Sequence, residues 1–97
     1  MNDKVYLAID LGAGSGRLLA GHTDLRDLKL EEIHRFDNPG TNLPGGLVWN
    51  VVGLYREIIH GLKLAVARYG DKIQSLGIDT WGVDFALLDV QGRLLGL

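Results

Sequence analysis

The sequence contains no cysteine, and only two of its 97 residues are proline. The missing cysteines exclude a disulfide framework and any thiolate metal site, and they fit a reducing compartment. No stretch approaches the roughly 18 consecutive apolar residues that a membrane-spanning helix needs. The N-terminal apolar run, residues 5–9, ends at Asp10 and is too short for the core of a signal peptide. These absences predict a cytoplasmic protein.

Runs of basic residues are also missing, and the formal net charge is −2. A nucleic-acid-binding domain carries a basic patch or stripe, so this balance argues against such a partner. With 46% hydrophobic and 23% charged residues, the composition is that of an ordinary globular protein. The length suits one domain or a part of one.

Three strands are expected before the first proline. Residues 5–9 are apolar and rich in β-formers, which predicts a buried central strand. The "GAGSG" of residues 12–16 predicts a turn, and residues 17–24, with an internal glycine, favour a strand over a helix. A third strand is predicted over residues 28–36. Its alternation places on one face Leu28, Leu30 and Glu32, and on the other face Ile33 and Arg35.

Residues 37–46 contain both prolines and predict a loop. One clear helix follows, with Asn50 as its N-cap and Gly70 as its stop signal. Apolar residues at helical spacing predict its packed face: Val51, Leu54, Tyr55, Ile58, Leu62, Ala65, Val66 and Tyr69. The charged residues are expected mainly on its solvent side: Arg56, Glu57, Lys63 and Arg68. The charges of residues 24–32, "DLRDLKLEE", are likewise expected to be solvated.

After the helix, "SLGIDTWG" (residues 75–82) predicts a strand that enters a turn, and residues 85–97 predict a hairpin around "DVQG". The predicted order is therefore β-β-β-α-β-β. Three antiparallel strands precede the helix, which crosses over to a strand parallel to the first. The fold class expected from this order is α/β with a mixed sheet.

The glycines of "IDLGAGSGRLLAG", residues 9–21, leave three interpretations open. A dinucleotide site needs G-x-G-x-x-G followed by a helix, but here the spacing is G-x-G-x-G and the next segment favours a strand. Alternatively, the loop joins two strands and its amides approach a phosphate. Asp10 then faces the metal that accompanies ATP, Ser15 adds a hydroxyl and Arg17 adds a cation. The third interpretation is a glycine-rich hairpin that only turns the chain.

Two motifs together resemble the FGGY carbohydrate kinases, which belong to the actin-like ATPase superfamily. "AIDLGAGSGR" (residues 8–17) resembles the first phosphate motif of that family, and "GIDTWGVDFALLD" (residues 77–89) is the more specific match. "EIHRFDN" (residues 32–38) and Trp49-Asn50 also fit, although the family usually has Trp-Asp at the latter position. The resemblance implies a partial ribonuclease-H-like (actin-like ATPase) domain, with ATP and Mg²⁺ as cofactors and L-rhamnulose as the sugar substrate.

The resemblance also assigns site residues. It implies ATP contacts at Ala13, Gly14, Ser15, Gly16 and Arg17 and a sugar contact at Gly82, with Trp81 beside it to shape the sugar pocket. Asp10, the acid at the end of the first strand, completes the expected cofactor site as its metal contact. The family more often has Ala-Ser-Ser-Gly-Arg in the loop, so Gly14 lacks a hydroxyl but keeps its amide. The family's catalytic aspartate matches no position in these residues. We therefore expect residues 1–97 to be the N-terminal part of the first kinase domain, without the second domain and without kinase activity alone.

Two other functions remain open at this point. In a metal-dependent nuclease with a ribonuclease-H-like fold, Asp10 and Asp79 are a candidate acidic pair, although the acidic balance of the chain argues against a nucleic-acid substrate. A non-catalytic assembly fragment is the other alternative, because the exposed sheet edges of a partial domain favour self-association. Asp79 and Asp84 flank the Trp-Gly turn and have two interpretations: contacts with sugar hydroxyls or with Mg²⁺-bound water, or a polar rim of the turn that caps local backbone amides.

Overall fold

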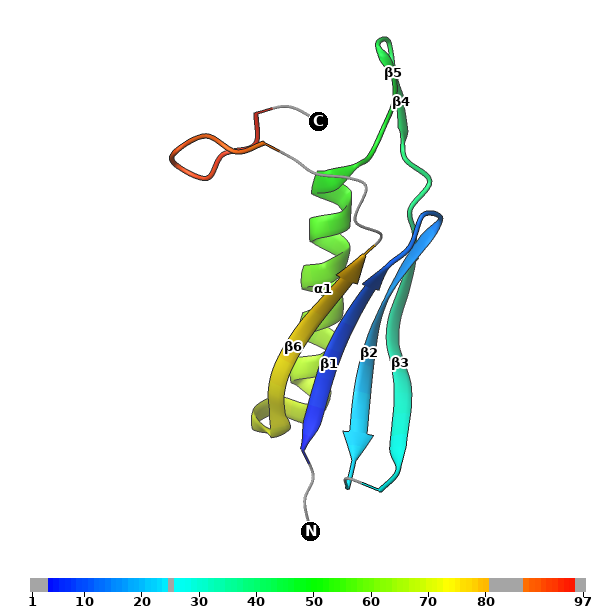
Figure 1. Ribbon diagram of the computed structural model, residues 1–97, viewed down its shortest axis with the longest axis vertical. Coiled ribbons are helices and arrows are strands. Elements are labelled where there is room, and N and C mark those ends of the chain that lie inside the picture. The colour runs from blue at the N-terminus through cyan, green and yellow to red at the C-terminus, as the bar shows by residue number, and fades with distance from the viewer. Residues whose placement is uncertain (1–3, 25, 81–86, 96–97) are drawn as a thin grey trace.

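The structure, a computed structural model, describes residues 4–24, 26–80 and 87–95 (Figure 1). Its main sheet has four strands in the order β3-β2-β1-β6. The strands are β1 (Val5–Leu11), β2 (Ser15–Thr23), β3 (Leu28–Asp37) and β6 (Ile73–Thr80). β2 pairs antiparallel with both β1 and β3, whereas β6 runs parallel to β1. The mixed sheet and its central first strand are as the sequence predicts.

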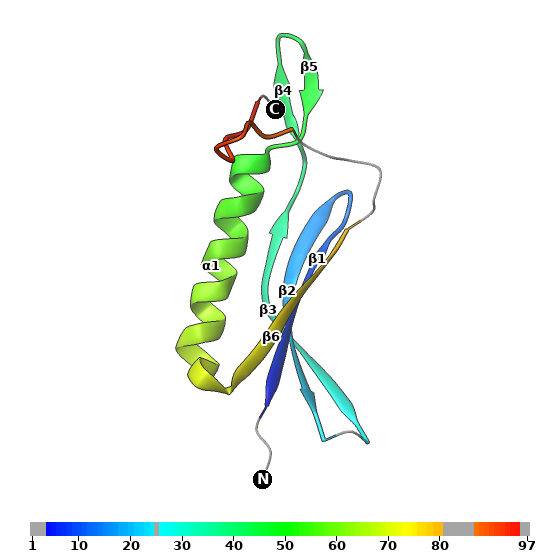
Figure 2. The ribbon, with the colours of Figure 1, turned by 60° about the vertical axis from the view of Figure 1, so that its left-hand side comes forward.

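A single long helix, α1 (Val51–Tyr69), lies on one side of this sheet (Figure 2). The Asn50 side chain accepts a hydrogen bond from the Gly53 amide at 3.0 Å, so it is the predicted N-cap. Gly70 ends the helix with a φ of 54°, and its amide donates to the carbonyl of Val66. A short 3-10 turn, η1 (Gly70–Lys72), then leads directly into β6.

The core lies between α1 and the face of the sheet that the helix covers. Its fully buried apolar residues are Val5, Leu7, Ile9, Leu18, Ala20 and Ala65. Their alternation along β1 and β2 gives these strands one buried face, as the period of a strand requires. Gly61 is also buried, and a Cβ atom there would lie 3.1 Å from the Cδ2 of Leu18. The small side chains of Gly61 and Ala65 therefore let the helix approach the sheet closely.

The contact between helix and sheet is narrower than the sequence predicts. Tyr55 and Val66, both expected on the packed face, are 64% and 58% exposed. The helix packs mainly on β2 and β3, and on β6 it leaves Leu76 44% and Ile78 62% exposed. An amphipathic pattern fixes which side of the helix is apolar, but the width of the buried stripe depends on where the helix crosses the sheet.

A bulge in β3 changes which residues share a face. Leu18 pairs with His34 and Leu19 pairs with Glu32, which leaves Ile33 as an extra residue. Leu28, Leu30 and Glu32 share one face, as predicted. Arg35 pairs with Arg17 and lies on that same face, so its predicted place on the opposite face is wrong.

Two smaller hairpins lie outside the main sheet. Strand β4 (Thr41–Leu43) lies within the segment predicted as a loop, and strand β5 (Gly46–Val48) begins at its last residue; the two pair antiparallel. The prolines and glycines around these short strands are typical of a loop, so the sequence pattern did not predict them. Near the C-terminus, an antiparallel bridge joins Leu88 and Leu94, and the amide of Gly92 donates to the carbonyl of Asp89 at 2.9 Å. This confirms the predicted hairpin around residues 89–92.

Two carboxylates that were expected to be solvated instead make polar contacts between α1 and the sheet. Glu31 accepts hydrogen bonds from the Tyr69 hydroxyl and from Arg68, and His22 lies 3.4 Å from the same carboxylate. Glu57, expected on the solvent side of the helix, lies 2.6 Å from the Nε2 of His34. These contacts form only when the helix lies against β2 and β3, so they depend on tertiary packing.

We expect Tyr69→Phe to weaken the pH dependence of stability in acid. The hydrogen bond from Tyr69 is the main cause that holds the pKa of Glu31 below its usual value, and it raises the pKa of Tyr69. A carboxylate with a lowered pKa stabilises the fold fully above its unfolded pKa, about 4.3 for glutamate, and loses this contribution as the pH falls. The stability difference between wild type and variant should therefore be largest near neutral pH and shrink below about pH 4.

Urea denaturation between about pH 3 and pH 7 measures this difference. Tyr55→Phe removes the same hydroxyl from a residue of the same helix that is 64% exposed, and it should leave the pH profile unchanged. Parallel profiles for Tyr69→Phe and wild type would contradict the role given to the hydrogen bond.

Candidate functional site

The glycine loop joins β1 and β2 as a tight turn at one end of the sheet. The Gly12 amide donates to the carbonyl of Ser15 at 2.8 Å, and β2 begins at Ser15. Extended strand therefore follows the loop, where a dinucleotide-binding fingerprint requires a helix. This excludes the dinucleotide interpretation and leaves the phosphate-binding hairpin and the plain turn.

Asn38, which sequence reasoning missed, holds this loop from the end of β3. Its backbone amide donates to the carbonyl of Gly14 at 3.0 Å, and its side-chain Nδ2 donates to the carbonyl of Gly12 at 3.3 Å. The residue is only 6% exposed. Because one buried side chain and its backbone fix two carbonyls of the turn, the loop is preorganised. The sequence signals were the polar "DNPG" at the end of β3 and the motif "EIHRFDN", which ends at Asn38 but to which no role had been assigned.

The glycines of the loop have different reasons to be small. None of Gly12, Gly14 and Gly16 has a positive φ. A Cβ on Gly16 would lie 2.4 Å from the Cζ of Phe36, whereas a Cβ on Gly14 would meet nothing within 4 Å. Gly16 is therefore required by packing, and Gly14 lies at the open tip beside the exposed Ala13.

The antiparallel register brings Asp10 and Arg17 together on the face of the sheet that α1 does not cover. Asp10 pairs with Arg17 across β1 and β2, and the Nη1 of Arg17 donates to its carboxylate. The Nη2 of Arg17 donates to the Ser15 hydroxyl at 2.9 Å. Within the described part of the chain, the buried Nε of Arg17 has no hydrogen-bond partner. The Arg17 and Asp10 side chains are 24% and 41% exposed, so an ion or ligand in solvent can reach both.

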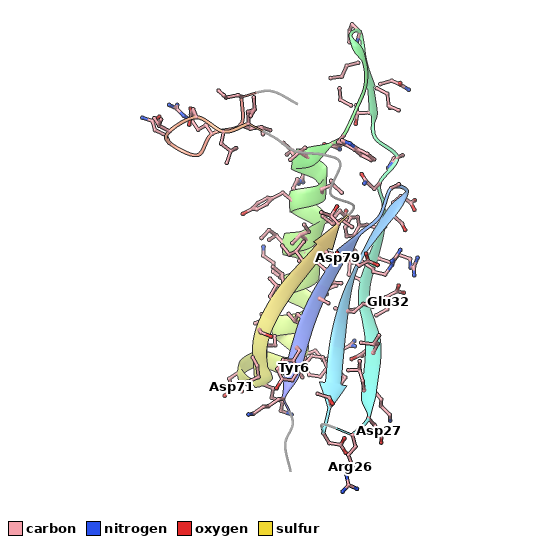
Figure 3. All side chains as sticks on the ribbon, in the orientation of Figure 1. Tyr6, Arg26, Asp27, Glu32, Asp71 and Asp79 are labelled. Carbon is pink, nitrogen blue, oxygen red and sulfur yellow. The ribbon has the colours of Figure 1, made fainter. Side chains whose placement is uncertain are left out.

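Asp79 lies beside Asp10, because the parallel register pairs these two residues across β1 and β6. Figure 3 shows Asp79 near the end of β6 that is closer to the glycine loop. Mg²⁺ is held by one or two carboxylates together with waters and phosphate oxygens, so this donor set fits that ion. Among the residues that the structure describes, no group of three or more His, Asp or Glu side chains could hold a metal by itself.

The predicted site residues thus divide into two groups. Asp10, Ser15, Gly16 and Arg17 lie together at the hairpin, with Ala13 and Gly14 at its tip. Trp81 and Gly82, predicted as sugar contacts, lie outside the described residues, as does Asp84. Two relevant residues were missed: Asn38 behind the loop, and Arg35, which lies next to Arg17 only because of the β3 bulge.

Comparison with known proteins shows the family to which the chain belongs. A rhamnulokinase of Bacteroides thetaiotaomicron is 52% identical over 90 residues, which are 93% of this chain. A rhamnulokinase of Oceanobacillus iheyensis is 51% identical over 83 residues, which are 86% of the chain. This chain belongs to the rhamnulokinase family. No protein-family model matches it.

Membership in the rhamnulokinase family fits the observed topology, an α/β fold with a mixed sheet, and gives it a ribonuclease-H-like class. The matched region covers 18% and 17% of the length of these two rhamnulokinases. Within the described residues, no helix is long and apolar enough to span a membrane.

Proposed function

We propose that the whole protein is a sugar kinase that transfers the γ-phosphoryl group of ATP to the 1-hydroxyl of L-rhamnulose. The product is L-rhamnulose 1-phosphate. The observation that carries the proposal is the identity of 52% to a rhamnulokinase over 93% of this chain. It is supported by a glycine hairpin that presents Asp10, Ser15 and Arg17 on one open face. ATP is made and used in the cytoplasm, so the proposal places the protein there.

In this proposal, residues 1–97 are the N-terminal part of the first kinase domain. The second domain and the catalytic base, an aspartate in the family, belong to other parts of the whole protein. The proposal is supported by the relatives, which are several times longer than the matched region.

The glycine hairpin would hold the phosphates of ATP through backbone amides, with contacts at Asp10, Ala13, Gly14, Ser15, Gly16 and Arg17. Asp10 would hold Mg²⁺, which when bound neutralises charge on the transferring phosphoryl group. Arg17 supplies a guanidinium and Ser15 a hydroxyl on the same strand. Trp81 and Gly82 are the proposed sugar contacts. Phosphoryl transfer depends mainly on such positioning and charge neutralisation, which a preorganised loop can supply.

The 97-residue chain alone should show no L-rhamnulose-dependent release of ADP from ATP. The reason is that deprotonation of the sugar hydroxyl needs a positioned base, which we place elsewhere in the whole protein. A coupled ADP-release assay with and without L-rhamnulose tests this, and the full-length protein should be active in the same assay. Sugar-dependent turnover by the 97 residues alone would overturn the assignment of the base.

Two alternatives each rest on one observation. The side-by-side register of Asp10 and Asp79 is the acid pair that a metal-dependent nuclease would need, and cleavage of a labelled RNA–DNA duplex would favour it. The edge strand β6, with Ile78 62% exposed, favours self-association of an assembly fragment. A solution mass well above the 10.6 kDa of one chain would support that alternative. We place the kinase first because neither observation explains the identity to rhamnulokinases.

A further inference from the structure

A row of four charged residues crosses the open face of the main sheet. The strand registers place Asp79 beside Asp10, Asp10 beside Arg17, and Arg17 beside Arg35. Two carboxylates therefore lie on β6 and β1, and two guanidinium groups lie on β2 and β3. Figure 3 labels Asp79, the member of this row on β6, and Glu32, which lies on the same face of β3 as Arg35.

The two inner members of the row already satisfy each other. Arg17 donates to the Asp10 carboxylate and uses its other Nη atom to bond Ser15 at 2.9 Å. At the outer end, the Nε of Arg35 donates to Glu32 at 2.7 Å, and the Arg35 side chain is 56% exposed. The centre of the row is thus an ion pair, with a second carboxylate, Asp79, on one side and a second ion pair, Arg35–Glu32, on the other.

This ion pair opposes the binding of any single ion. A free cation that approaches Asp10 must compete with the guanidinium of Arg17, and a free anion that approaches Arg17 must compete with the carboxylate. A ligand that carries a cation next to an anion replaces both halves of the pair at once. Its cation can take the place of Arg17 on Asp10, and its anion can take the place of Asp10 on Arg17.

We infer that the Asp10–Arg17 ion pair is replaced by contacts to the ligand when the site is occupied. The site therefore takes a metal–polyphosphate complex as one unit and disfavours either free ion. This inference rests on the proposed function and adds an orientation to it. Asp10, with Asp79 beside it, would hold the metal, and Arg17, with Arg35 beside it, would face the phosphates.

The distinctive consequence is that removal of Arg17 changes two affinities in opposite directions. In Arg17→Gln, free Mg²⁺ no longer competes with the guanidinium, so we expect it to bind about two- to fivefold more tightly, the upper part of the range that exposed ion pairs contribute. The same variant loses an anion contact, so Mg·ATP should bind several-fold more weakly. A residue that only positions the ligand would lower both affinities or leave the affinity for Mg²⁺ unchanged.

Isothermal titration of the 97-residue chain with MgCl₂ alone, and with ATP in the presence of excess Mg²⁺, measures both affinities. Arg26→Gln is the matched control, because it removes the same charge from an exposed residue in the turn between β2 and β3. It should change neither affinity beyond a small general effect. Arg17→Lys keeps a cation beside Asp10 and should bind free Mg²⁺ nearly as weakly as wild type.

Ser15→Ala keeps the inference testable if Arg17→Gln does not fold. It removes the hydrogen bond that holds Arg17 and should raise the affinity for free Mg²⁺ to a smaller extent. The inference is overturned if neither variant binds free Mg²⁺ more tightly than wild type. This includes the case in which no variant binds Mg²⁺. The proposed function is tested separately, by whether the full-length protein phosphorylates L-rhamnulose. If it does not, the metal and nucleotide affinities of these variants can still be compared.

Discussion

Replacing Ile9 with alanine should lower the free energy of unfolding by about 2–5 kcal/mol, the usual cost of deleting a buried aliphatic side chain. Ile9 is 1% exposed and lies in the middle of β1, between the sheet and the helix. The surrounding strands are hydrogen-bonded on both sides of β1, so they cannot close fully over the cavity. Because small domains have only about 5–15 kcal/mol of stability, this loss is a large fraction of the total. Urea denaturation followed by circular dichroism measures it.

Ile78→Ala is the matched control for this prediction. Ile78 pairs directly with Ile9 across β1 and β6 and lies on the same face of the sheet, yet it is 62% exposed. Its truncation should cost less than about 1 kcal/mol, which reflects strand propensity and a little burial. Equal losses from the two variants would show that the helix does not cover the sheet where the structure places it.

Gly16→Val should destabilise the protein by about 1–3 kcal/mol, because it adds atoms to a space that is already filled. A Cβ at this position would lie 2.6 Å from the Cε2 of Phe36 and 3.2 Å from the Cδ2 of Leu11. Phe36 is itself only 8% exposed, so its ring cannot turn into solvent without leaving the core. The midpoint of urea denaturation should fall while the dependence on urea concentration stays unchanged.

Gly14→Ala makes a smaller change two residues away and should alter stability by no more than about 0.5 kcal/mol. A Cβ there meets no atom within 4 Å, and the φ of Gly14 is not positive. Together, the two variants distinguish two hypotheses. Either the loop needs glycine only at position 16, for packing, or it needs glycine at every position. A large loss in Gly14→Ala would favour the second description.

Much of the fold could be predicted from the sequence because it depends on local patterns. The apolar run of β1, the capping residue Asn50 and the stop at Gly70 each act within a few residues of the element that they define. The absence of a helix after Gly16 also followed from local features, namely a short segment with an internal glycine. The short strands β4 and β5 were missed because the prolines and glycines around them are equally typical of a loop.

The candidate site was predictable only in part. The loop and its flanking Asp10 and Arg17 were found from their motif, and the hairpin register brings these two side chains into an ion pair that was not predicted. The roles of the ATP and sugar contacts stay predictions. Asn38 and Arg35 were not found, since one depends on the end of β3 reaching the glycine loop and the other on a single extra residue in β3.

The amino-acid sequence alone was enough to predict the four strands of the main sheet, the start and end of the helix, and the motif that turns the chain after Asp10. These features follow from steric and hydrogen-bonding preferences that act over one or two turns of backbone. Only the tertiary structure decided that Asp79 lies beside Asp10, that Arg35 joins Arg17 and that Glu31 meets Tyr69. Those contacts join residues from separate elements, so they depend on strand register, on one bulge and on how closely Gly61 lets the helix approach the sheet.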